Sequence, residues 1–225
     1  MRKKDPINEV KAALTARLHI DLKQHPVECR LEGDAIVLEG AVQGIALKKK
    51  ALLIAMGIAG TTGVIDRLKV EPSARMTDKE IEKHFYDALA GEPALNTLGI
   101  EAEVRDGVVD IEGAVPSLTH KRLAGVLAWW VPGSTDVINS LEVDPPEEDS
   151  DDEIADAVAA VFEKDRLVDE SSLKARVKDW AVTLEGIAFS EGEKKAAEDD
   201  AWYVWGVNDV VNNIRVEKRR PGTGG

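Results

Sequence analysis

Apolar and polar positions follow one pattern that recurs three times along the chain, each time 73 residues further on. The clearest markers are a glycine after an apolar–Glu pair and a valine that closes an apolar segment. The glycines are Gly40, Gly113 and Gly186, and the valines are Val70, Val143 and Val216. A repeat at a fixed period predicts adjacent copies of one unit. The chain therefore divides into three predicted modules, over residues 5–72, 76–145 and 150–218.

Each module contains two predicted strands joined by a tight turn. Before the turn, apolar and polar residues alternate, as expected of a strand with one buried face. The apolar positions are Val27, Cys29 and Leu31, then Ile100, Ala102 and Val104, then Leu173, Ala175 and Val177. The turn Asp106-Gly107 suits a hairpin. The third copy has Asp179-Trp180 instead, which is poor turn chemistry because tryptophan disfavours a positive φ.

Two amphipathic helices complete each module. The first helix has a good N-cap in every copy, namely Asp5, Thr77 or Ser150. Thr77 and Ser150 also stand three residues before a glutamate, as in a capping box. The second helix shows a buried stripe with i, i+3, i+4, i+7 spacing, in which Asp200 is the one polar residue. The stripe is Ala51, Ile54, Ala55 and Ile58, then Ala124, Leu127, Ala128 and Val131, then Ala197, Asp200, Ala201 and Val204.

The order helix–strand–strand–helix–strand predicts an α+β fold made of three tandem α-β-β-α-β modules. The second strand, second helix and third strand form a crossover that should be right-handed, so each three-stranded sheet is mixed. Both helices of a module should cover one face of its sheet. A unit of ~70 residues buries only a small core, so we expect packing between copies.

Net charge and hydropathy exclude several classes of protein. The chain carries 42 acidic and 29 basic residues, a net charge of −13. Bulk charge of this sign disfavours binding to nucleic acid or to an anionic membrane. No apolar run approaches the ~20 residues of a transmembrane helix, and the N-terminus has no apolar signal region. The sequence as it stands predicts a cytoplasmic protein, or a periplasmic one if an export signal has been removed.

The repeated motifs resemble those of the BON domain, a family named after bacterial osmotic-stress and nodulation proteins. Residues 107–115 and 137–143 of the second copy match most closely, with Gly107, Gly113 and Asn139 at the motif positions. The resemblance covers most of the chain. It implies a binding or structural module rather than an enzyme, with links to the cell envelope and to osmotic stress. In some members it implies binding to anionic phospholipid, and in one group to potassium.

Aromatic residues gather at the ends of the second and third copies' second helices, beside the apolar stripe. They are Trp129, Trp130, Trp202, Tyr203 and Trp205. Three interpretations stay open. The rings cover a seam between modules, they form an interface for a protein partner or a second copy, or they anchor the chain at a membrane interface.

Three lysines, Lys48, Lys49 and Lys50, open the second helix of the first copy, and residues 1–72, with 12 basic and 9 acidic residues, are the one part of the chain with net positive charge. Such a run is usually a solvated face. Cations at a helix N-terminus oppose the macrodipole, however. The alternative is therefore a contact with anionic phospholipid or with an acidic partner.

Motifs of catalysis and metal binding are missing from the sequence. The histidines lack metal-ligand spacing, no HExxH or CxxC occurs, and no nucleophile stands in an elbow. We expect no enzyme activity, cofactor or metal. The leading hypothesis is a non-catalytic tandem-module protein for binding or assembly under osmotic or envelope stress, with the Trp-rich helix ends contacting a protein partner or a second copy. The alternative is a peripheral protein that binds anionic phospholipid through the lysine run.

Overall fold

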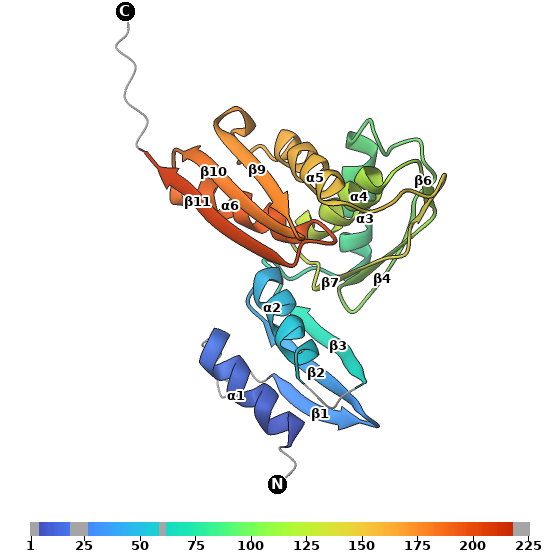
Figure 1. The fold of residues 1–225 in the computed structure, drawn as a ribbon. Helices are drawn as coiled ribbons and strands as arrows, with labels where there is room; N and C mark the ends of the chain where they lie inside the picture. Colours follow the sequence, from blue (N-terminus) through green and yellow to red (C-terminus); the bar gives the residue numbers. More distant parts are fainter. Residues whose placement is uncertain (1–4, 19–26, 59–61, 218–225) are drawn as a thin grey trace, which may run out of the picture. The chain divides into compact units, whose positions relative to one another are not determined.

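The computed structural model describes residues 5–18, 27–58 and 62–217, and the fold is α+β, as predicted (Figure 1). The chain forms two compact units, Met1–Arg75 and Met76–Gly225. The first unit contains one module and the second contains the other two. Because these two modules share one unit, the boundary between them stays a prediction from the sequence.

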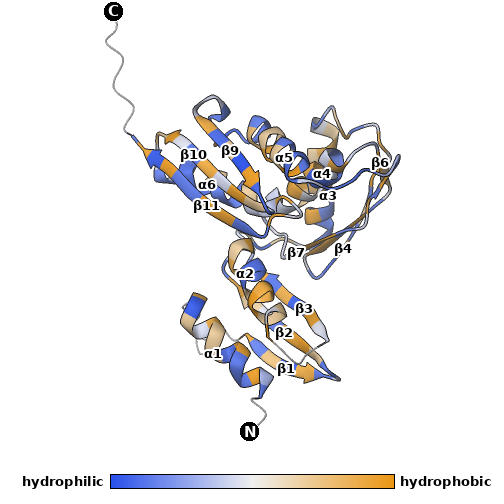
Figure 2. Cartoon of the chain, in the orientation of Figure 1, coloured by the Kyte–Doolittle hydropathy of each residue, from blue (hydrophilic) through white to orange (hydrophobic). Residues whose placement is uncertain are grey.

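The first unit is a mixed three-stranded sheet covered by two helices. β1 pairs with β2 antiparallel, and β2 pairs with β3 parallel. Helices α1 and α2 contact each other and the sheet, and Cys29 lies in the core between them, as predicted. The elements are α1 (Pro6–Leu18), β1 (Glu28–Glu32), β2 (Ala35–Val42), α2 (Ile45–Met56) and β3 (Gly63–Val70). Figure 2 shows apolar and polar residues mixed along the strands, and β2 begins with four apolar residues in a row.

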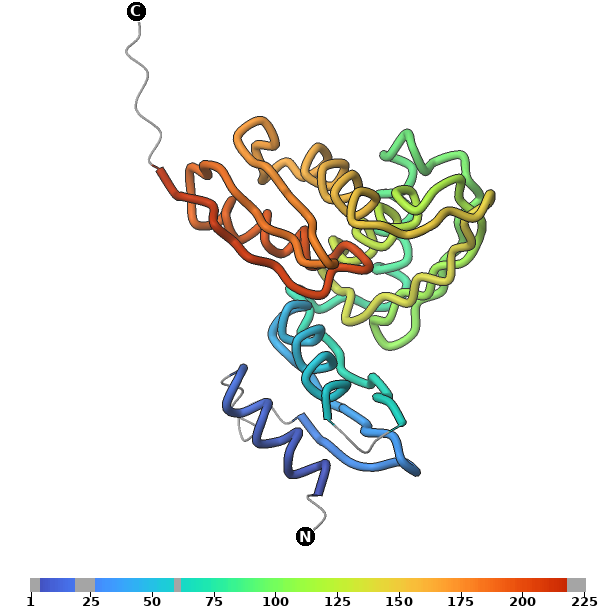
Figure 3. Tube along the Cα trace, in the orientation of Figure 1, coloured from blue at the N-terminus to red at the C-terminus, as the bar shows by residue number. Residues whose placement is uncertain are grey.

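The second unit repeats this arrangement twice, and Figure 3 shows the course of the chain. Its sheet orders are β4-β5-β7, extended by the pair β6-β8, and β11-β10-β9. One module consists of α3 (Asp78–Gly91), β4 (Glu101–Arg105), β5 (Val108–Glu112), β6 (Ala114–Val115), α4 (Leu118–Trp130), β7 (Asp136–Asn139) and β8 (Glu142–Val143). The other consists of α5 (Asp151–Lys164), η1 (Glu170–Ser172), β9 (Leu173–Lys178), β10 (Ala181–Ala188), α6 (Glu191–Tyr203) and β11 (Asp209–Val216). The helices of the two modules face each other, and the sheets lie outside them (Figure 1).

The first helix of each module begins at its predicted N-cap. Thr77 makes both halves of the capping box with Glu80, and the Ser150 hydroxyl accepts from the backbone N–H of Glu153 at 3.2 Å. The Asp5 carboxylate accepts from the backbone N–H of Ile7 at 3.0 Å. These bonds satisfy backbone donors that a helix leaves unpaired at its start.

An aspartate just after the cap ties the first helix to the hairpin in two of the modules. Asp151 accepts from the backbone N–H groups of Asp179 and Trp180, at 2.8 and 2.9 Å. Asp78 makes the same two bonds in the second module, at 3.0 and 2.9 Å. Trp180 adopts the left-handed conformation, with φ 65°. For an L-residue this conformation costs about 1–2 kcal/mol, so the poor turn chemistry predicted for Trp180 is confirmed as strain.

The asparagine of the closing motif fastens the third strand to the second helix. The side-chain amides of Asn139 and Asn212 donate to the carbonyls of Lys121 and Lys194, at 2.7 and 3.2 Å. A lysine of the second helix makes the reverse contact with the third strand: the Lys194 ammonium donates to the Ile214 carbonyl at 2.7 Å.

None of the helices in the described ranges is long and apolar enough to span a bilayer.

Candidate functional site

Helix α4 forms the seam between the second and third modules. It contacts α3 of its own module and both α5 and α6 of the next. All seven residues from Arg122 to Ala128 are buried. Because an α-helix turns once in 3.6 residues, an unbroken run of this length leaves no face of that stretch in water. Helix α4 is therefore core to both modules.

The predicted aromatic residues meet where α4 and α6 end. The rings of Trp129 and Tyr203 stack with centroids 5.7 Å apart and an interplanar angle of 14°. The indole N–H of Trp130 donates to the Asp200 carboxyl at 2.9 Å. Trp202 has no exposed surface. The expectation that Trp202 belongs to a contact surface is wrong, because its ring is part of the core.

Asp200, the polar residue in the apolar stripe, is buried at this seam. Burial raises the pKa of its carboxyl to about 8, and the nearby Asp165 carboxylate adds to the rise, while the bond from Trp130 opposes it. Near neutral pH the carboxyl therefore holds its proton. Burying a neutral acid costs less free energy than burying a carboxylate, which suits the position of Asp200 in the seam.

Arg122 carries the buried cation of the seam and has no exposed surface. Its Nε donates to the backbone carbonyl of Trp205 at 3.0 Å, and its Nη2 pairs with the Asp149 carboxylate. The guanidinium carbon also lies 5.8 Å from the centroid of the Trp205 ring. Sequence reasoning missed Arg122, because the other two copies have an ordinary lysine at the same repeat position.

Two tryptophans remain exposed beside this buried cation. The side chains of Trp205 and Trp180 are 53% and 36% exposed, and both lie next to Gly206. A Cβ built on Gly206 would stand 3.5 Å from the Trp180 ring and 3.5 Å from the Arg122 guanidinium. The Lys121 ammonium lies 5.6 Å from the centroid of the Trp205 ring. We call Trp180 and Trp205 the tryptophan patch.

The lysine run of the first module is only partly exposed. Lys48 is 4% exposed, and its ammonium donates to the Leu68 carbonyl at 2.6 Å and pairs with Asp66 at 3.1 Å. The expectation that Lys48 binds phospholipid is wrong, because its charge is engaged inside its own module. Lys49 and Lys50 are half-buried.

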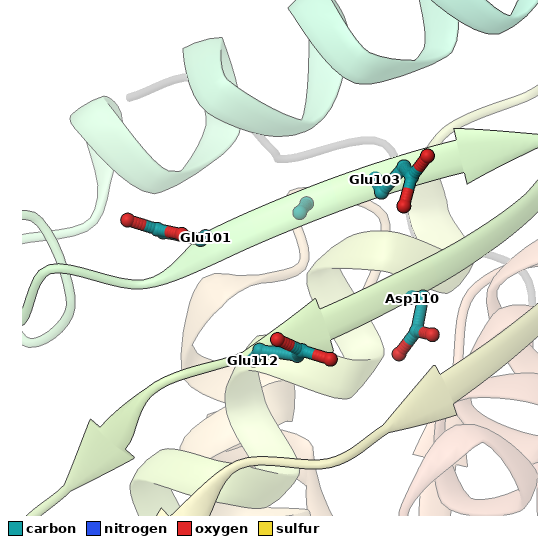
Figure 4. Close-up of a pocket in the computed structure, with 5 residues that line it drawn as sticks. Glu101, Glu103, Asp110 and Glu112 are labelled. Atoms are coloured by element: carbon teal, nitrogen blue, oxygen red, sulfur yellow. The ribbon is translucent and has the colours of Figure 1, made fainter.

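An acidic depression of about 180 Å³ lies on strands β4 and β5 (Figure 4). Glu101 stands opposite Glu112 and Glu103 opposite Asp110, so each cross-strand pair brings two carboxylates together. Like charges in this position repel. Among the residues the structure describes, no group of three or more His, Cys, Asp or Glu side chains is placed to hold a metal ion.

The BON domain model matches the chain three times, over residues 8–72, 77–145 and 150–218. The chain belongs to the BON domain family. This BON protein is 26% identical over 140 residues to osmotically-inducible protein Y of Escherichia coli (strain K12), across 60% of this chain and 69% of that protein.

Two solved structures show weaker likeness. One is the C-terminal domain of CdsD, a structural protein of the type III secretion system of Chlamydia trachomatis, at 13% identity and TM-score 0.27 over 96% of this chain and 100% of that one. The other is the PrgH periplasmic domain, at 11% identity and TM-score 0.25 over 88% of this chain and 98% of that one. At such scores nothing about this BON protein follows from them.

Replacing Arg122 should destabilise the second unit strongly. In Arg122→Ala the Trp205 carbonyl and the Asp149 carboxylate lose their partner, so we expect a loss of about 3 kcal/mol in the free energy of unfolding. Urea unfolding followed by tryptophan fluorescence measures it, since all five tryptophans lie in this unit. Lys195→Ala is the matched control at the same repeat position, on an exposed pair with Asp199, and should stay within about 0.5 kcal/mol of wild type. Equal losses would contradict the role of Arg122.

The pKa of Asp200 should make stability fall with rising pH. The folded carboxyl keeps its proton up to pH about 8, whereas the unfolded one releases it near the ordinary value of 3.8. Unfolding therefore releases a proton between these limits, and the free energy of unfolding declines across that window. Asp200→Asn keeps the acceptor for Trp130 and should flatten the decline between pH 5 and 8, as seen by urea unfolding at each pH. Asp156→Asn, at an exposed position on α5, should leave it unchanged.

Proposed function

We propose that this BON protein is a non-catalytic binding and assembly protein linked to osmotic or envelope stress, and that the tryptophan patch is its contact surface. The observation that supports the proposal most is the exposure of Trp205, 53% of its side chain, beside a buried cation. Tryptophan is the residue type most enriched among interface hot spots. Tryptophan is highly buried on average, so an exposure of this size is unusual.

The patch is also held in place before any partner arrives. Arg122 fixes the backbone of Trp205, and Lys121 and Arg122 lie against its ring. The backbone N–H of Trp180 is fixed by Asp151. A rigid aromatic surface loses little conformational entropy on binding, which favours affinity.

The link to osmotic stress rests on the family and on the similarity to osmotically-inducible protein Y. The choice of a protein partner rests on the chemistry of the patch, in which aromatic rings lie beside cations. Because Lys48 is engaged with Asp66 and Leu68, binding to anionic phospholipid through the first module would depend on Lys49 and Lys50.

Removing Trp205 should abolish self-association without unfolding the chain. We expect wild type to show a mass above 24.4 kDa that rises with concentration, and Trp205→Ser to shift toward the monomer in light scattering. Trp129 and Trp130 are unsuitable for this test, because they hold the seam. The matched control is Leu167→Ser, since Leu167 is 70% exposed and lies outside the patch. It should keep the mass of wild type.

Circular dichroism establishes that Trp205→Ser is folded before its mass is compared. A wild-type chain that stays monomeric at its highest soluble concentration would contradict self-association as the mode of assembly. A folded Trp205→Ser variant with the mass of an oligomeric wild type would contradict the patch as the contact surface.

A further inference from the structure

A hollow of about 340 Å³ lies in the third module between helix α5, η1 and the edge strand β9. Phe162 and Leu173, which are both buried, form its apolar base. Ala155, Ala159 and Ala175 line its sides, and Glu170 and Ser171 stand at its rim. Cavities of roughly this size, apolar with a few polar groups, are typical of ligand sites.

The second module shows what fills this place. The residue 73 positions before Ala159 is Tyr86 on α3, and the residue 73 before Ala175 is Ala102 on β4. The Tyr86 hydroxyl accepts from the backbone N–H of Ala102 at 3.0 Å and donates to its carbonyl at 3.4 Å. A single phenol thus lies against the edge strand and bonds both the N–H and the C=O of Ala102.

The third module has the groove without the phenol. Ala159 replaces Tyr86, and Ala155 replaces Glu82 one helical turn away. No side chain in the described ranges hydrogen-bonds to the backbone of Ala175. An edge-strand N–H and C=O left open in this way are ready donor and acceptor for an added group.

We propose that this hollow binds a tyrosine side chain of a protein partner, with the phenol hydroxyl bonded to the N–H and C=O of Ala175. The ligand chemistry follows from Tyr86, since a phenol makes those two bonds at the equivalent position of the second module. The site shares no residue with the tryptophan patch, so it is independent of the function proposed above.

The test uses the full chain, labelled with ¹⁵N, and follows backbone amide shifts in NMR titrations. The probes are p-cresol, which is the tyrosine side chain alone, toluene, which lacks the hydroxyl, and N-acetyl-tyrosinamide, which carries the flanking peptide groups. We expect p-cresol and N-acetyl-tyrosinamide to shift the amide of Ala175 and its neighbours in β9. Toluene should bind about tenfold or more weakly, because it leaves two hydrogen bonds unmade.

Two variants test whether the shifts arise from binding in this hollow. Ala159→Tyr should fill the hollow from within, abolish the p-cresol shifts, and raise protection of the Ala175 amide from hydrogen exchange toward that of Ala102. Tyr86→Ala should open an equivalent site in the second module, so that p-cresol now shifts the Ala102 amide as well. The matched control Ala159→Ser keeps the hollow and should keep binding within about twofold of wild type.

Three results would overturn the proposal. The first is the absence of shifts at Ala175 with both phenols. The second is equal affinity for toluene and p-cresol, which would mean that the hydroxyl makes no bond. The third is binding of p-cresol without N-acetyl-tyrosinamide, which would make the site one for free phenols and not for a protein side chain. Since Trp205→Ser leaves the hollow intact, failure here is distinguishable from failure of the tryptophan patch.

Discussion

A module of about 70 residues buries a small core and is only marginally stable alone, and in the second unit two modules enlarge that core by packing on opposite sides of one helix. Helix α4 packs on its own sheet and is also covered by α5 and α6. Two hydrogen bonds join the modules across the seam: Arg122 donates to the Trp205 carbonyl, and Trp130 donates to Asp200. The two modules form one compact unit, and the position of Trp205 in the third depends on Arg122 of the second.

The repeat positions show how one scaffold is adapted to this packing. Lys48 and Lys194 occupy the same position and bond the carbonyl of the third strand in their own modules. Lys121 occupies it in the second module, where its ammonium lies over Trp205. At the next position, Arg122 is buried in the seam while Lys195 makes an exposed pair. At both positions the residue of the second module is the one that contacts the third, through an unchanged lysine at Lys121 and a substituted arginine at Arg122.

Local patterns made the fold predictable from the sequence. The caps at Thr77 and Ser150, the alternating strands and the small-residue stripe depend on neighbours in the chain, so the repeat revealed them. Whether the aromatic side chains are buried depends on which helices pack against each other, and no local sequence pattern indicates that packing. Trp202 was therefore expected on a surface and lies in the core, and Lys48 was expected to face solvent and is buried. Asp200 gave one useful signal, since a carboxyl in an apolar stripe needs a partner.

Two replacements in the third module work against its stability, and both lie at the surfaces proposed for recognition. Trp180 takes the place of Gly107 at a positive φ, at a cost of about 1–2 kcal/mol. Ala159 takes the place of Tyr86 and leaves the Ala175 backbone without the phenol that covers its counterpart. If stability alone were selected, the third module would have glycine in place of Trp180 and tyrosine in place of Ala159. Strained residues cluster at functional sites, which agrees with the recognition surfaces proposed for the third module, since both changes alter the surface that it presents.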